Sequence, residues 1–347
     1  MNNNLDKRSN APSDLPVVLS KYVDRLEAAL HLSIPEAVIS LYQSVRYHMG
    51  WVDQAGEPVS GGIGKRLRPT LCLMACEAVG GLPEEAIPAA VALELIHNFS
   101  LVHDDIQDQD AERHGRPTVW SLFGESNALN VGDTLYVLGY KTLIEAAQFS
   151  NTKAINLRVF ERLTQSVLDL VEGQYLDLEF EKRLDVTTEE YLDMSMRKTG
   201  ALIVCATEVG AIIGSGDSAV SSILARTGWY TGQLFQIRDD VLGIWGDTAA
   251  TGKAVNSDIW RRKKTFPVVH AIQHASGTAA TVMRMLYEKA CLSDVDVGQV
   301  LDVLDSTGAR KEAEILSVRL AEQAVDTIRK ADISPKRVSD FEDLVSF

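Results

Sequence analysis

Two aspartate clusters, each reached by a long helical pattern of apolar residues, constrain this chain most strongly. The first holds Asp104, Asp105 and Asp108, and the second holds Asp239 and Asp240. Two carboxylates about 4 Å apart repel by roughly 4 kcal/mol at an effective dielectric near 20, and a whole domain is stable by only about 5 to 15 kcal/mol. We therefore expect cations between the clusters. Oxygen donors without a nearby cysteine favour a hard ion such as Mg²⁺.

The spacing of the first cluster predicts which side chains share a helix face. Residues four apart lie on one face, so Asp104 and Asp108 point the same way. Ser100 lies one turn below Asp104, and His97 lies two turns below it. We interpret this polar line, in an otherwise apolar helix, as the wall of a pocket.

Helical periodicity covers almost the whole chain from Lys21 onward and predicts an all-α fold. We expect a single-domain helical bundle with a central cavity over residues 17–347, in which two facing helices bring their carboxylates onto a metal ion. Residues 1–16 are polar and are expected to form a disordered tail, neither a signal peptide nor an anchor. The expected helices cover residues 17–31, 35–48, 66–80, 84–106, 119–148, 152–182, 187–214, 217–244, 265–276, 278–291, 295–306, 308–331 and 335–345.

The charge balance restricts the possible partners. With 34 Lys and Arg against 48 Asp and Glu, the net charge is −14, which argues against nucleic acid or an anionic membrane as a partner. The basic residues are gathered locally, several beside Gly or Pro at expected helix ends, where free backbone N–H groups bind anions. We predict a diphosphate site from the basic clusters at residues 64–69, 113–117, 197–200, 251–253 and 261–264.

Two further features concern the environment of the chain. The apolar segment 201–214 is too short and, with Thr207 and Glu208, too polar to span a membrane, so we expect a buried central helix. The four cysteines form no CxxC motif, and we expect reduced core residues of a cytoplasmic protein. They are Cys72, Cys76, Cys205 and Cys291.

The ordered motifs resemble those of the trans-isoprenyl diphosphate synthases, the all-helical head-to-tail prenyltransferases. The resemblance runs from about residue 20 to the C-terminus and implies a helical bundle of the isoprenoid synthase type. It is carried by Gly64-Lys65-x-x-Arg68-Pro69, His97, Asp104-Asp105-x-x-Asp108, Arg113, Gly173-Gln174, Lys198-Thr199, Phe235-Gln236-x-x-Asp239-Asp240 and the loop from Gly246-Asp247 to Lys253.

The resemblance implies a role for each matching residue. Asp104, Asp108 and Asp239 would bind Mg²⁺, with Asp105 and Asp240 in support. The allylic diphosphate would be held by Arg113, Lys198 and Lys253, and isopentenyl diphosphate by Lys65, Arg68 and His97. Gln236 would lie between the two substrates, with Gln174 and Thr199 lining the reacting region. The family usually forms homodimers.

Two positions depart from the family pattern. The second motif usually has a third aspartate where this chain has Gly243, and Asp247 could support the metal shell or cap its loop. His114 stands where the second residue of an arginine pair is usual. We expect Arg116 to take over that contact with isopentenyl diphosphate, and we count His114 and Arg116 among the substrate-binding residues.

Product length depends on the depth of the pocket below the first motif. Phe99 lies five residues before Asp104, about 7.5 Å down the helix, and the small Ser100 lies four residues before it. With an aromatic residue at position 99, the chain resembles geranylgeranyl diphosphate synthases. Farnesyl diphosphate is the close alternative product.

Three other functions fit the sequence less well than condensation. A terpene cyclase binds one diphosphate, whereas Lys65, Arg68 and His97 indicate a second diphosphate site. A non-catalytic partner subunit would lose the metal carboxylates, and both pairs are present. A metal phosphohydrolase built on His103-Asp104 would need further histidine ligands, which the chain does not offer at suitable spacing.

Overall fold

The computed structural model describes residues 17–36, 39–59, 64, 66–148, 153–246 and 255–346. Helices dominate this part of the chain, which confirms the predicted all-α class. Within this part, β structure is limited to a hairpin of two strands with two residues each and to an isolated bridge between Val52 and Pro58. The elements are α1 (Val17–Ser20), α2 (Val23–Ser33), α3 (Ser40–His48), α4 (Leu67–Ala78), α5 (Pro83–Gln107), β1 (Glu112–Arg113), β2 (Arg116–Pro117), α6 (Val119–Phe123), α7 (Glu125–Gln148), α8 (Lys153–Glu181), α9 (Thr188–Ser195), the π-helical turn η1 (Met196–Gly200), α10 (Ala201–Ser215), α11 (Ser218–Trp245), α13 (Ser257–Trp260), α14 (Phe266–His274), α15 (Gly277–Tyr287), α16 (Asp294–Ser306), α17 (Ala309–Ile328) and α18 (Pro335–Ser346).

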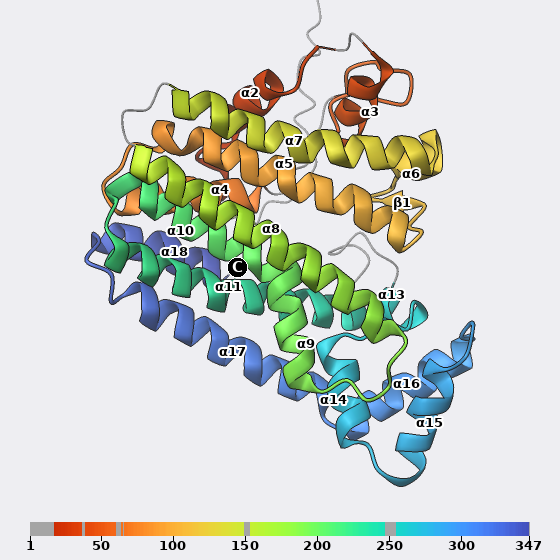
Figure 1. The fold of residues 1–347 in the computed structure, drawn as a ribbon. Coiled ribbons are helices and arrows are strands. Elements are labelled where there is room, and N and C mark those ends of the chain that lie inside the picture. Colours follow the sequence, from red (N-terminus) through yellow and green to blue (C-terminus); the bar gives the residue numbers. More distant parts are fainter. Residues whose placement is uncertain are drawn as a thin grey trace, which may run out of the picture.

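The long helices run side by side, and α13 to α16 gather at one end of the bundle (Figure 1). Helix α10 lies at the centre, where it contacts α4, α5, α8 and α11. Nearly every residue of α10 is buried, which confirms the expected central helix. The two aspartate clusters lie on α5 and α11, on opposite sides of this centre.

Several expected helices have different boundaries for local reasons. The helix expected over 119–148 is divided at Gly124, whose φ of 83° ends α6. The helix expected over 187–214 contains the π-helical turn η1, which no periodicity argument anticipated. The helix expected to reach residue 291 ends at Tyr287, so Cys291 lies in a bend after the helix.

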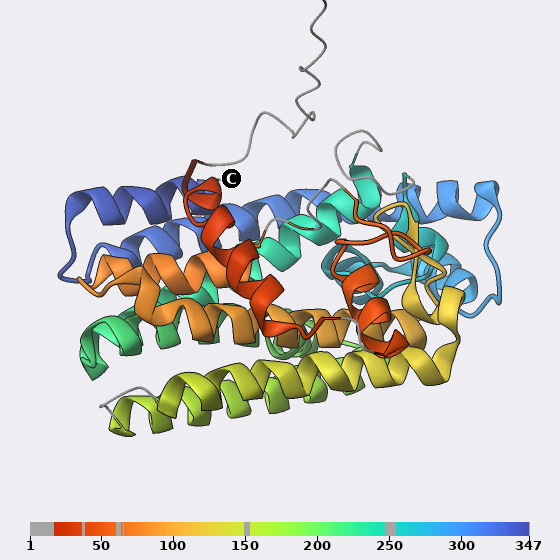
Figure 2. The same ribbon diagram turned by 90° about the horizontal axis from the view of Figure 1, so that it is seen from above.

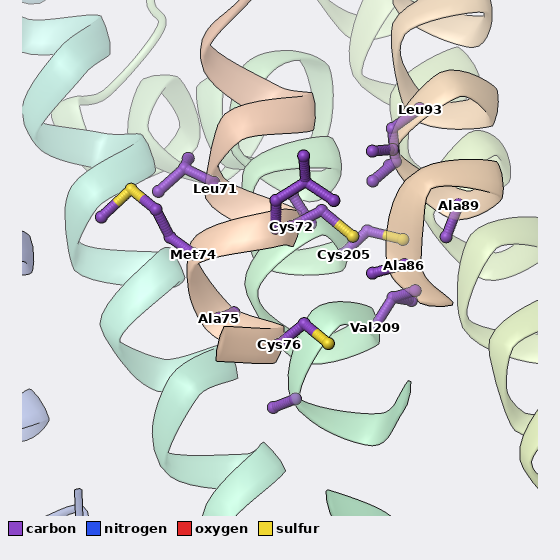
Figure 3. Close-up of a cluster of buried hydrophobic side chains, with 14 of the residues drawn as sticks. Leu71, Cys72, Met74, Ala75, Cys76, Ala86, Ala89, Leu93, Cys205 and Val209 are labelled. Carbon is purple, nitrogen blue, oxygen red and sulfur yellow. The ribbon is translucent and has the colours of Figure 1, made fainter. Parts of the chain in front are cut away.

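Three of the four cysteines are buried in the core of the bundle. Cys72, Cys76 and Cys205 are fully buried where α4, α5 and α10 meet, among small and aliphatic side chains (Figure 3). Burial raises the pKa of each of these thiols, so they remain protonated. The expectation that all four cysteines belong to the core is wrong for Cys291, which is exposed.

Two helical segments are long and apolar enough to cross a membrane by length and composition alone. They are Pro83–Gln107 and Thr188–Ser215. In the most apolar 18-residue window of each segment, 61% and 67% respectively is buried in the fold. Both pack inside the bundle as core helices, and their apolar composition serves that packing.

Candidate active site

A cavity of about 420 Å³ opens between the first motif, the β hairpin and the start of α4. Residues from both aspartate clusters reach it, because Asp105 of α5 and Asp239 of α11 both line its wall. Its positively charged and imidazole lining comes from His48, Arg66, Arg68, His97, Arg113, His114 and Arg116. The cavity is therefore a basic chamber in an acidic protein, with the acid motifs at its edge.

Arg68 and His97 form the part of this chamber best suited to an anion. Nη1 of Arg68 lies 3.0 Å from Nε2 of His97, and within the described ranges no carboxylate lies within ion-pair distance of Arg68. Burial lowers the pKa of Arg68 to about 10, and Glu94 offsets this only in part. Burial and the charge of Arg68 also lower the pKa of His97, so its ring is neutral. The guanidinium charge is left for a ligand to neutralise.

The β hairpin carries the basic residues that follow the first motif. Its turn has positive φ at His114 (53°) and Gly115 (70°), which is typical of a tight two-residue hairpin. Arg113 turns toward α5, where Nε donates to Oδ1 of Asp105 at 2.7 Å. Arg116 donates to the carbonyl of Val52 at 2.8 Å, and its guanidinium lies 4.4 Å from the centre of the Tyr47 ring. His114 also lines the cavity.

Lys198 connects the first motif to α8. Its Nζ lies 3.0 Å from Oδ1 of Asp104 and 2.6 Å from Oδ2 of Asp177. Burial favours the neutral acid at Asp104, but the charges of Lys198 and Arg113 outweigh it and lower the pKa of Asp104. Asp108 forms no ion pair with a described residue, and burial and repulsion from Asp104 outweigh the charges of Lys198 and Lys263 and raise its pKa to about 7. The negative charge of the first motif therefore exceeds the positive charge of Lys198 and Arg113 beside it.

Asp240 is the most enclosed carboxylate of the second motif. It accepts hydrogen bonds from the Tyr191 hydroxyl, from the Phe266 N–H at 2.8 Å and from Nε2 of Gln236 at 2.9 Å. Burial nevertheless raises the pKa of Asp240 to about 7. Gln236 also accepts from the Thr199 hydroxyl at 2.8 Å. This chain of hydrogen bonds joins η1 to the second motif.

The donor chemistry fits a hard divalent cation. The carboxylates of the two motifs outnumber Lys198 and Arg113, and burial raises the pKa of Asp105 to about 6 despite its ion pair with Arg113. Within the described part of the chain, no three His, Cys, Asp or Glu side chains already form a closed metal cluster. Mg²⁺ bound by a few carboxylates usually completes its shell with water and substrate phosphate.

The remaining expected site residues are distributed as follows. Nε2 of Gln174 donates to Oε1 of Gln107 at 2.8 Å, at the end of α5. The Ser100 hydroxyl donates to the carbonyl of His97 at 2.7 Å, and the Phe99 ring packs against Tyr136 with centroids 5.3 Å apart. Lys65, Asp247 and Lys253 lie outside the described residues.

The polar side chains of α5 contribute to two parts of the site. Asp104 and Asp108 do face a common partner, Lys198. His97, however, lines the cavity together with Asp105 and not with Asp104. Arg113 contacts both carboxylates, with Nε 2.7 Å from Oδ1 of Asp105 and Nη2 3.6 Å from Oδ2 of Asp104, and Lys198 pairs with Asp104 alone.

His103 does not support a phosphohydrolase site. Its ring turns toward α7, where it fills the space left by Gly132 and lies with Nε2 3.7 Å from Oδ1 of Asp133. The ring also packs edge-on against Phe99. His103 therefore serves the packing of two helices and does not extend the first motif.

Sequence reasoning missed three residues that complete the site. Asp177 pairs with Lys198, and Tyr191 donates to Asp240. Burial lowers the pKa of Lys263, but the charges of Asp177, Asp258, Asp240 and Asp239 outweigh it and raise that pKa, and Lys263 also acts on Asp104 of the first motif. Asp177 could have been found because it lies one turn after Gly173 on the same helix face. Lys263 stood within a recognised basic cluster, but nothing in the sequence singled it out.

The arrangement of the site indicates which substrates it can bind. An all-α bundle that faces two aspartate motifs across a basic cavity is suited to bind diphosphates with a divalent cation. The model of the polyprenyl synthetase family matches residues 50–304. The chain therefore belongs to the polyprenyl synthetase family, and it is a prenyltransferase of the isoprenyl diphosphate synthase type.

Relatives of known function support this assignment. The chain is 37% identical over 306 residues to a (2E,6E)-farnesyl diphosphate synthase of Mycobacterium tuberculosis, covering 87% of this chain and 84% of the relative. It is 35% identical over 335 residues to a geranylgeranyl diphosphate synthase of the same organism, covering 95% and 93%.

Solved structures agree with the fold. A polyprenyl synthetase from Streptomyces coelicolor A3(2) superposes with a TM-score of 0.89 at 33% identity, covering 96% of this chain and 99% of that one. A geranylgeranyl pyrophosphate synthase from Corynebacterium glutamicum, solved with isoprenyl diphosphate and magnesium, has a TM-score of 0.82 at 27% identity and covers 96% and 98%.

Proposed function

We propose that this enzyme condenses isopentenyl diphosphate with an allylic diphosphate, using Mg²⁺, and that its main product is geranylgeranyl diphosphate. The observation that carries the proposal is the presence of two cationic places, which adjoin where Arg113 lines the basic cavity. Lys198 and Arg113 are paired with the first aspartate motif, whereas Arg68 has no carboxylate within ion-pair distance in the described chain. Two such places suit two diphosphates, so condensation is favoured over cyclisation of a single substrate.

The allylic diphosphate would lie at the aspartate motifs. Asp104, Asp108 and Asp239 would hold Mg²⁺, with Asp105 and Asp240 in support. When bound, the ion would neutralise the charge on the departing diphosphate. Lys198 and Arg113, together with Lys253, would bind the same diphosphate and stabilise the negative charge that develops on it.

Isopentenyl diphosphate would occupy the cavity beside Arg68 and His97, with Lys65 completing the site. Arg116 and His114 line the same cavity and would contribute to this diphosphate. The neutral ring of His97 accepts from Arg68 and so fixes the direction of the guanidinium. Gln236, with Thr199 and Gln174, would line the region between the substrates.

In the proposed reaction, the allylic C–O bond breaks and its electron pair leaves with the diphosphate. The isopentenyl double bond then forms the new C–C bond, and the resulting cation loses a proton to the released diphosphate. No protein nucleophile is required. The role of the side chains is to position two anions and to stabilise the one that leaves.

The product is proposed from the floor of the pocket. Phe99, backed by Tyr136, would stop the growing chain, and Ser100 would leave room beside it. Farnesyl diphosphate is the second candidate, because a relative with that activity is as similar as one that makes geranylgeranyl diphosphate.

We also propose a cytoplasmic homodimer paired through α7 and α8, which lie along one edge of the molecule (Figure 2). Both helices expose large apolar side chains that a second copy would cover. These are Leu129, Val137 and Ile144 on α7, and Leu157, Leu168, Val171 and Tyr175 on α8.

Product analysis tests the proposal directly. The protein is incubated with Mg²⁺, dimethylallyl diphosphate and labelled isopentenyl diphosphate, and the products are separated by chromatography. We expect twenty-carbon diphosphate that disappears when a chelator removes the metal. A hydrocarbon would indicate a cyclase, and no product from properly folded protein would indicate a non-catalytic subunit.

A further inference from the structure

Helix α8 and the π-helical turn η1 cross at very short distance at one buried residue, Gly173. A Cβ added there would lie 2.2 Å from the backbone nitrogen of Lys198 and 2.7 Å from its Cα. These are backbone atoms, so no side-chain rotation can relieve the contact. The two backbones would have to separate by about 1 Å to reach ordinary van der Waals contact at 3.4 Å.

Polar contacts fix the register of the same crossing. Nη1 of Arg197 lies 2.5 Å from Oε2 of Glu172, and Nζ of Lys198 lies 2.6 Å from Oδ2 of Asp177. Glu172, Gly173 and Asp177 therefore meet two consecutive residues of η1. The position of the Lys198 ammonium depends on how closely the two backbones approach.

The π-helical turn brings two neighbouring side chains to two different helices. Lys198 reaches Asp104 of α5 at 3.0 Å, and the Thr199 hydroxyl donates to Gln236 of α11 at 2.8 Å. π-Helical turns are rare and occur frequently at functional sites. On the side of α11, a Cβ added at Gly232 would lie 3.0 Å from Cα of Gly200. The turn is thus held between a glycine of α8 and a glycine of α11.

We propose that Gly173 is a positioning residue for the condensation. By admitting the backbone of Lys198, it fixes the ammonium against Asp104 and against the allylic diphosphate. This inference rests on the proposed function, in which that diphosphate binds Lys198. A misplacement of about 1 Å can cost a hundredfold in rate at a preorganised site, so we expect at least a tenfold effect from a methyl group at this crossing.

The test compares Gly173→Ala with a matched control, Gly210→Ala. A Cβ at Gly210 would lie 2.1 Å from the carbonyl oxygen of Cys72, where α10 crosses α4 in the core shown in Figure 3. The control creates the same kind of backbone clash away from the aspartate motifs. Thermal unfolding and the Michaelis constants for both substrates are measured for each variant, with rates expressed per folded molecule.

We expect both variants to lose stability. Only Gly173→Ala should change the KM of one substrate and not that of the other. Its KM for the allylic diphosphate should rise at least tenfold and its kcat should fall, while its KM for isopentenyl diphosphate stays within twofold. Gly210→Ala should keep both constants. If both variants lose activity only in proportion to folded protein, with unchanged constants, Gly173 has a structural role alone.

A second variant keeps the inference testable if Gly173→Ala does not fold. Gly232→Ala displaces the same turn from its other side through the milder 3.0 Å contact with Gly200. We expect a two- to threefold rise in the allylic KM alone, and an unchanged value overturns the inference. Absence of product from the wild-type enzyme would instead overturn the proposed function.

Discussion

Position 243, where the family usually has a third aspartate, offers the sharpest test of how the second motif is built. A Cβ added at Gly243 would lie 2.0 Å from Oδ2 of Asp258 and 2.6 Å from its Cγ. Asp258 is 7% exposed, so its carboxylate cannot simply move into water. The space of a side chain at position 243 is already taken by the carboxylate of Asp258.

The cost of restoring the aspartate follows from this geometry. In Gly243→Ala, overpacking destabilises the fold by about 1 to 3 kcal/mol. The higher helix propensity of alanine offsets about 1 kcal/mol of this loss. In Gly243→Asp, a second charge about 4 Å from Asp258 adds roughly 4 kcal/mol at an effective dielectric near 20. The total is comparable with the whole stability of a marginal domain, about 5 to 15 kcal/mol.

Urea unfolding followed by circular dichroism measures the effect in a double-mutant cycle. We expect Gly243→Ala to lose less than about 2 kcal/mol and Gly243→Asp to lose about 5 kcal/mol or more. Adding Asp258→Ala to Gly243→Asp should recover several kcal/mol relative to the sum of the single changes. Additivity within about 0.5 kcal/mol would show that the two positions do not interact and would refute the reasoning.

Three further predictions address the substrates and the pH dependence. Arg116→Ala should raise the KM for isopentenyl diphosphate severalfold and leave the allylic KM unchanged, because Arg116 lines the basic cavity away from Lys198. Phe99→Ala should lengthen the product on chromatography, because it removes the ring that packs on Tyr136. Burial, only partly offset by Glu181, lowers the pKa of Lys264 to about 8. Its unfolded form keeps the proton to about pH 10.4, so stability should rise by about 2 kcal/mol from pH 8 to 10, and Lys264→Met should abolish the rise.

Each of these predictions has a clear opposing result. An unchanged KM for isopentenyl diphosphate in Arg116→Ala would show that Arg116 only braces Tyr47 and Val52. An identical product profile in Phe99→Ala would remove Phe99 as the floor of the pocket. Parallel stability curves for wild type and Lys264→Met would show that Lys264 is charged in the folded protein throughout this range.

The sequence was sufficient where a single local rule governs the structure. Helical periodicity predicted most long helices within a few residues, because each buries one apolar face. The composition of the segment around residues 201–214 predicted the buried α10 for the same reason. The first aspartate motif also lay at the end of its predicted helix, where Asp108 caps α5.

The sequence was insufficient where backbones or side chains from distant segments meet. The π-helical turn at Lys198 depends on the approach of Gly173 from α8, which no periodicity in residues 187–214 encodes. The ion pairs of the first motif depend on Lys198 and Arg113, two cations supplied by other elements. Asp258 explains Gly243 only once α13 packs on α11.

We propose that the carboxylates of α5 and α11 share a divalent cation with a bound diphosphate. A crystal structure with Mg²⁺ and an unreactive allylic diphosphate analogue would reveal this arrangement. We expect Mg²⁺ bound to Asp104 and Asp108 and to Asp239, with diphosphate oxygens completing the shells at about 2.1 Å and Lys198 contacting the same diphosphate. A diphosphate bound with both aspartate motifs turned away, and no metal between them, would contradict this proposal.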